Sequence, residues 1–87
     1  MPDLELHKDA ILTIDLPSEG LRAGDIGTIV ERHEVPGVAE VGYSVEFFDM
    51  TGDTVAVATL PASSLRAPTS ADLPAVRPFS KSTTSSD

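Results

Sequence analysis

The sequence predicts an all-β protein, a small SH3-like and partly open barrel of about five short strands with one short helical turn. Three observations support this fold class. Apolar and β-branched residues recur in short runs with a period of two, turn residues separate the runs, and glycines interrupt the run at 21–30. A domain of this size buries only about 60% of the surface of its unfolded chain, which suits thin β layers.

Four segments of the chain have the pattern of strands. They span residues 10–16, 25–33, 43–48 and 54–60. The first is expected to bury one face, formed by Ala10, Leu12, Ile14 and Leu16, and to end at Pro17. In the second, Gly27 indicates a kink or the close approach of another backbone, because glycine inside a strand otherwise weakens it.

The connections carry equally specific signals. The loop at 17–24 contains one large apolar residue, Leu21, which we expect to fold back as a plug over the end of the barrel. Residues 49–53 predict a hairpin in which Gly52 takes the position that needs a positive φ. Residues 61–65 predict a single helical turn started by proline, and a short last strand follows around 66–67.

A wider pattern spans most of this region. Its members are Asp15-Leu16-Pro17, Gly20-Leu21, the run at 24–30, Val45-Glu46-Phe47, Gly52 and Thr59-Leu60-Pro61. Taken together in this order, over roughly residues 8–67, they resemble a family of small bacterial proteins, the domain of unknown function 4926. The resemblance implies an SH3-like fold. It also implies a protein partner, because members often sit beside genes for toxin-like proteins or enzymes, and it implies no catalytic residues.

The composition changes at Pro68, which divides a predicted barrel domain, 1–67, from a flexible tail rich in proline, serine and threonine, 68–87. Within the tail, Leu73, Val76 and Phe79 lie on a backbone stiffened by proline. Such a segment loses little conformational entropy when it binds in a groove, so it predicts a docking peptide. The alternative is a spacer whose apolar residues are incidental.

The charge of the chain indicates the kind of partner. Fourteen acidic residues against six basic ones give a net charge of −8, all of it within 1–67. Such a surface attracts basic proteins and repels nucleic acid. The alternative is that the acidity serves only to keep the protein soluble. The residues expected to contact a protein partner are Glu31, Glu34, Val38, Glu40 and Glu46, together with Leu73, Val76 and Phe79 of the tail.

The loop at 34–42 is the most suggestive of these regions, because its three valines follow no alternation that would bury them all. Exposed apolar residues among acidic ones are typical of protein interfaces. The alternative is that Val35 and Val41 pack inward and leave only Val38 exposed.

Catalytic and metal chemistry have little support in the sequence. His7 and His33 belong to different elements, and Asp49 and Asp53 flank a turn that accounts for them. Serines have no base and orienting group beside them. We therefore predict that the protein is not an enzyme and has no cofactor or metal.

The absence of cysteine and of an apolar run of about 18 residues predicts a soluble, cytoplasmic protein without membrane contact. The expected function is a non-catalytic protein-binding module, an acidic accessory or antitoxin-like inhibitory partner of another protein. Two alternatives remain. One is a small structural subunit of a larger enzyme complex, docked through its C-terminal tail. The other, disfavoured by the charge, is a nucleic-acid-binding barrel, since residues 23–30 loosely resemble KOW-type segments.

Overall fold

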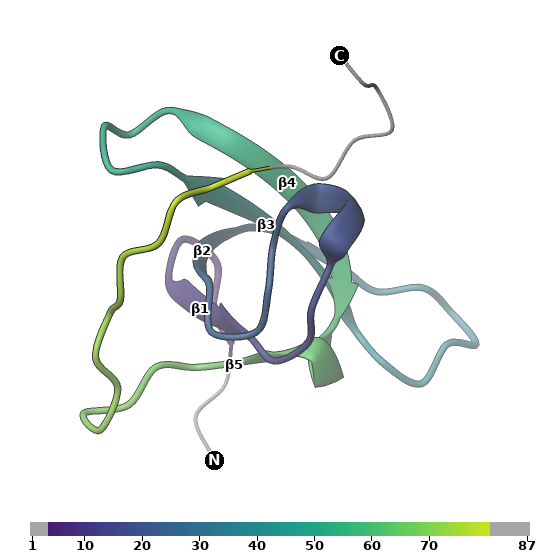
Figure 1. The fold of residues 1–87 in the computed structure, drawn as a ribbon. Coiled ribbons are helices and arrows are strands. Elements are labelled where there is room, and N and C mark those ends of the chain that lie inside the picture. Colours follow the sequence, from purple (N-terminus) through teal and green to yellow (C-terminus); the bar gives the residue numbers. More distant parts are fainter. Residues whose placement is uncertain (1–3, 81–87) are drawn as a thin grey trace.

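The computed structural model describes residues 4–80 and shows five strands and two short 3-10 helices (Figure 1). In chain order these are β1 (Asp9–Leu12), η1 (Pro17–Glu19), β2 (Ile26–His33), β3 (Gly42–Phe48), β4 (Thr54–Pro61), η2 (Ala62–Ser64) and β5 (Leu65–Arg66). The all-β class is thereby confirmed. The predicted helical turn corresponds to η2, and η1 is a second one that the sequence did not predict. Proline starts η1, and Gly20, with a φ of 73°, ends it.

The strands form one antiparallel sheet in the order β4-β3-β2-β1-β5. The sheet is open, with β4 and β5 at its two edges, and it is strongly curled (Figure 1). The longest ladder joins β3 and β4, from the pair Gly42 and Pro61 to the pair Phe48 and Thr54. Its hairpin is closed as the sequence predicts, with Gly52 at a φ of 92°.

The core lies on the inner side of this curled sheet. Its largest fully buried side chains are Leu12, Ile29 and Val45, one from each of three neighbouring strands. Leu21 joins the same cluster and is only 4% exposed, so the loop before β2 does fold back as a plug. An antiparallel bridge between Leu16 and Leu21 holds the loop closed at its base.

Gly27 marks the close approach that its place in the strand predicts. A Cβ at this position would lie 2.6 Å from Cγ1 of Val45 and 2.9 Å from the carbonyl oxygen of Glu46. Glycine is therefore required by contact with β3, since no other residue lacks a Cβ.

The first strand is shorter than the alternation predicts. It ends at Leu12, and Ile14, expected on the buried face, is an exposed residue. The amide of Thr13 still donates to the carbonyl of Ser64 at 2.8 Å, which is the next position along the pairing of β1 with β5. Alternation continues in the sequence, but the two neighbouring strands begin at Ile26 and Leu65, opposite Ile11 and Leu12, and do not extend beside residues 13–16. The expected strand over 10–16 is therefore wrong in its second half.

Candidate functional site

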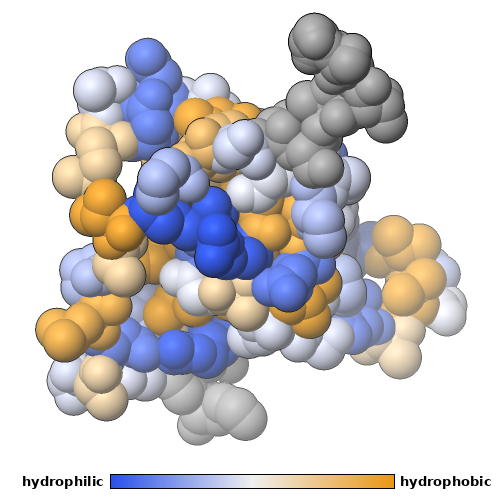
Figure 2. Space-filling view, in the orientation of Figure 1, coloured by the Kyte–Doolittle hydropathy of each residue, from blue (hydrophilic) through white to orange (hydrophobic). Residues whose placement is uncertain are grey.

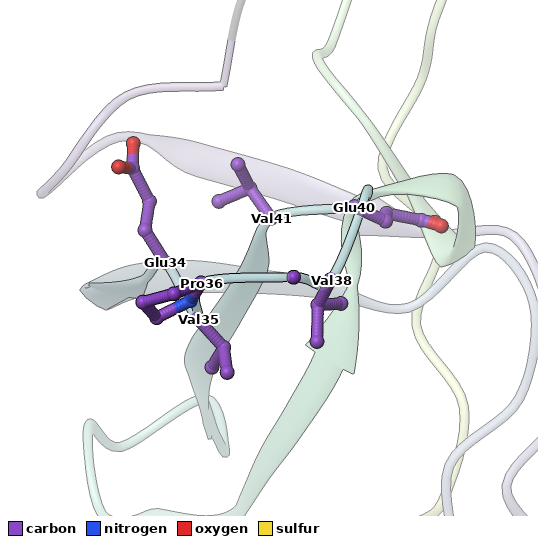
Figure 3. Close-up of a pocket in the computed structure, with 7 residues that line it drawn as sticks. Glu34, Val35, Pro36, Val38, Glu40 and Val41 are labelled. Atoms are coloured by element: carbon purple, nitrogen blue, oxygen red, sulfur yellow. The ribbon is translucent and has the colours of Figure 1, made fainter.

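The loop between β2 and β3 projects from the body of the protein (Figure 1). Val35 and Val38 point to the same side of it and are 56% and 57% exposed, whereas Val41 points the other way and packs against the core (Figure 3). A turn at the tip, with Gly37 at a φ of 84°, closes through the amide of Val38 and the carbonyl of Val35 at 3.0 Å. Two of the three valines are therefore displayed, one more than the inward-packing alternative allows.

The same loop curves around a shallow hollow of about 340 Å³, lined by its own residues 34–38 together with Glu40 and Val41. Space-filling representation shows apolar surface gathered on this projecting part of the molecule (Figure 2). The loop thus presents a small apolar tip beside carboxylates, which is the composition of a modest protein contact.

The four acidic residues expected to meet a partner do not form one open acidic face. Glu34 makes an ion pair with Arg32, and Glu31 is exposed on β2. Glu40 accepts hydrogen bonds from the amide and the hydroxyl of Ser63, at 3.2 and 3.1 Å, and so ties the base of the loop to η2. These carboxylates differ in how free they are to bind another molecule.

Glu46 lies apart from the loop, in the middle of β3 opposite Thr28 of β2 and Val57 of β4. Its carboxylate accepts a hydrogen bond from the hydroxyl of Thr54. Of the expected set, the structure brings Glu34, Val38 and Glu40 together on one loop, and it does not bring Glu46 to them.

A row of polar side chains crosses three strands near the same end of the sheet. Nε2 of His33 lies 2.8 Å from the hydroxyl of Ser44, which lies 3.0 Å from the hydroxyl of Thr59. The carboxylate of Glu31 lies 3.8 Å from that same Nε2. In a serine–histidine–carboxylate triad the acid binds the other ring nitrogen, so this geometry joins strands and is not that of an activated nucleophile.

The C-terminal segment, defined here as residues 68–80, runs along the body as an extended chain (Figure 1). Leu73 and Val76 are 90% and 82% exposed, and Phe79 is exposed to a smaller degree. Leu73 and Val76, two of the three apolar residues of the predicted docking peptide, are therefore not buried against the body of this protein.

Two arginine–aspartate pairs hold the segment. Arg66 binds Asp72 through both terminal nitrogens, at 2.9 and 2.7 Å, and Arg77 binds Asp25, 52 residues away in sequence. The hydrogen bonds from Arg66 and from the Thr69 amide hold the pKa of Asp72 well below its ordinary value, and the hydrogen bond to Asp25 raises the pKa of Arg77. None of these four charged residues was expected at a site. The sequence did offer one signal for them, because Asp72 and Arg77 are the two charged residues of the segment at 68–80 and have opposite signs.

Among residues 4–80, no group of three or more histidine, cysteine, aspartate and glutamate side chains is placed to hold a metal ion. The described part of the chain also contains no helix with the length and apolar character of a transmembrane span.

These features describe a small, open, all-β domain with two exposed apolar regions. The chain belongs to the family described as Domain of unknown function (DUF4926), whose model matches residues 6–67. This confirms the resemblance found in the sequence, while the SH3-like description of the fold stays a prediction. No curated protein and no solved structure matches the chain.

Proposed function

We propose that this protein is a non-catalytic protein-binding module of the cytoplasm, an acidic accessory or antitoxin-like inhibitory partner of a basic protein. The observation that carries the proposal is the projecting loop at 34–41. Its exposed valines lie beside carboxylates on a chain with a net charge of −8. An apolar tip supplies contact area, and the surrounding negative charge steers a basic partner toward it.

The loop is also held in a way that suits binding. Its base is fixed, because Glu40 binds Ser63 and the amide of Ala62 donates to the carbonyl of Val41 at 2.9 Å. The tip is thereby displayed by a rigid support, and little conformational entropy is lost when a partner covers it.

A pair of loop variants, Val35→Ser and Val38→Ser combined, tests this proposal. We expect the double variant to lose about tenfold or more in affinity for the partner that crosslinks to the wild type in its own cell extract, because two exposed apolar anchors are removed. Val57→Ser is the matched control, since Val57 is a valine of 55% exposure on β4, away from the loop. Equal binding by the double variant and the wild type would overturn the proposal.

Ionic strength provides a second readout. A complex steered by the acidic surface weakens as salt rises, through a slower association rate. An association rate that is the same at low and high salt would contradict the charge-steered part of the proposal. Apolar contact would then be the only remaining basis for binding.

A second function rests on a separate observation, the exposure of Leu73 and Val76 beside an anchored Arg77. A structural subunit of a larger complex would bury these side chains against a neighbouring chain. Leu73→Ser with Val76→Ser would then release the protein from its complex, while the loop variants would leave it bound.

A further inference from the structure

The side chain of Arg77 occupies a polar niche that has the geometry of an arginine receptor. Its Nε donates to Oδ1 of Asp25 at 3.1 Å, its Nη2 donates to Oδ2 of Asp25 at 2.5 Å, and Nη2 also donates to the carbonyl of Gly20 at 2.9 Å. A carboxylate fork with an added carbonyl matches the planar guanidinium, and an ammonium group cannot reproduce this pattern. The two charged side chains are 24% and 19% exposed, so the pair is largely shielded from solvent.

The receptor side of this pair is built by the domain itself. The Asp25 carboxylate accepts from the amide of Arg22 at 2.8 Å, and the Asp25 amide donates back to the carbonyl of Arg22 at 3.0 Å. The Asp25 carbonyl accepts from the amide of Leu12 at 2.9 Å, which fixes it to the end of β1. Gly20 is fixed by its own amide, which donates to the carbonyl of Pro17, the first residue of η1. Asp25 and Gly20 are thus positioned by bonds that do not involve the C-terminal segment.

The two sides of the pair also belong to different parts of the chain. Asp25 and Gly20 lie within the region matched by the family model, 6–67, whereas Arg77 lies outside it. The arginine is therefore supplied to the domain by an attached segment, as a ligand is supplied to a site.

An apolar groove continues from the receptor. A cavity of about 440 Å³ lies between the segment at 74–79 and the body, and the body lines it with Leu21, Ile26, Phe47, Phe48, Met50 and Val55. The segment passes over this groove without filling it, and Val76 next to the anchored arginine stays exposed to solvent. Apolar surface that is partly covered by a tethered chain is available to an occupant of better shape.

We propose that Asp25, the Gly20 carbonyl and this groove form a binding site for an extended, arginine-containing segment of a partner protein, and that Arg77 is an internal occupant which the partner's arginine replaces. The acidic charge of the domain favours such a basic ligand. The site lies at 20–26 and along the β3–β4 hairpin, so the inference goes beyond the loop at 34–41 and does not rest on it.

A peptide added to the full-length protein tests the site. The probe is a fluorescent peptide with the sequence of residues 71–80, and its binding is measured by fluorescence anisotropy. A tethered occupant competes at an effective concentration on the order of millimolar, so the wild type should bind the peptide weakly. Arg77→Ala removes that competition, and we expect it to bind the peptide about tenfold or more tightly than the wild type does.

Three comparisons make the chemistry specific. Replacing the peptide's arginine by lysine should weaken binding to the Arg77→Ala protein about tenfold, because the fork and the carbonyl cannot all be satisfied. Adding Asp25→Asn to the Arg77→Ala protein should remove most of its affinity for the arginine peptide. Ile26→Ser supplies a second variant on the exposed groove wall, so the test stands even if Asp25→Asn disturbs the turn with Arg22.

The proposal is overturned if Arg77→Ala binds the peptide no better than the wild type, or if arginine and lysine peptides bind equally. It is also overturned if the wild type is a dimer that Arg77→Ala dissociates in sedimentation, since the occupant is then the segment of a second copy. The Val35→Ser and Val38→Ser variant should bind the peptide as its parent does, which separates failure of this site from failure of the loop.

Discussion

The loop at 34–41 and the C-terminal segment at 68–80 both display apolar side chains, but the protein holds them by different means. The loop is a short turn between paired strands, fixed at its base by Glu40 and Val41. The segment is an extended chain held by two arginine–aspartate pairs. Backbone pairing survives changes in salt and pH that weaken ion pairs, so we expect the loop to keep its place under conditions that release the segment.

The largest expected effect concerns the sheet on which both regions depend. Gly27→Ala should lower the free energy of unfolding by about 1–3 kcal/mol, because the added methyl group overlaps β3 at Val45 and Glu46. Urea denaturation measures the change. Thr28→Ala, one residue further along the strand, should cost less, within about 1 kcal/mol. If Gly27→Ala is as stable as the wild type, the approach of β2 to β3 is not as close as described.

Releasing the segment should have the next largest effect. Arg77→Ala should weaken the attachment of residues 74–79 by about 1–2 kcal/mol, since a shielded, charged hydrogen-bond pair is lost. Amide hydrogen exchange should rise near Arg77 and Asp25 and stay unchanged in the loop at 34–41. Faster exchange in both places would break the distinction between the two regions.

The ion pair between Arg66 and Asp72 makes the attachment of the segment dependent on pH. The pKa of Asp72 is lowered from its ordinary value of 3.8, chiefly by Arg66. A carboxylate whose folded pKa is depressed stabilises the fold above its unfolded pKa, and this contribution is lost as the pH falls through the folded value. Arg66→Ala should therefore raise the pKa of Asp72 toward 3.8 in an NMR titration of the carboxyl carbon.

Asp49 is the internal control for that titration. Its pKa is also lowered, chiefly by the hydroxyl of Thr51 and then by the backbone of Asp53, and neither depends on Arg66. Its titration should be the same in both proteins, and a parallel shift of Asp49 and Asp72 would show that Arg66→Ala acts through the whole fold.

The smallest effect on stability is expected at the tip of the loop. Val35→Ser and Val38→Ser should each change the free energy of unfolding by no more than about 0.5 kcal/mol, because both side chains are exposed. Val41→Ser should cost about 1–3 kcal/mol in the same denaturation experiment, since this valine packs against the core. A similar cost at all three positions would mean that the tip is not displayed.

Local patterns were sufficient for most elements of the fold. The strands now seen at β2, β3 and β4, the hairpin at Gly52 and the buried plug at Leu21 follow from alternation and turn chemistry, which act over a few residues. The same rule failed at Ile14, because the strands on either side of β1 begin at Ile26 and Leu65 and do not extend beside this residue. Where strands 12 and 51 residues further along the chain begin leaves no trace in local alternation.

The candidate site divides in the same way. The valines and carboxylates of the loop could be found by composition, although Glu40 turned out to bind Ser63 of its own chain. Arg77 and Asp25 could not be paired from the sequence, because nothing in either neighbourhood specifies a partner so far away. Charge complementarity has no periodicity that would reveal it.

Residue types and their short spacing were enough to specify an all-β chain, the positions of its turns, its acidity and its family. The folded arrangement was needed to show which carboxylates bind groups of their own chain, which valines face outward and where the segment at 68–80 lies. These depend on how the sheet curls, and curvature brings together residues that the chain keeps far apart.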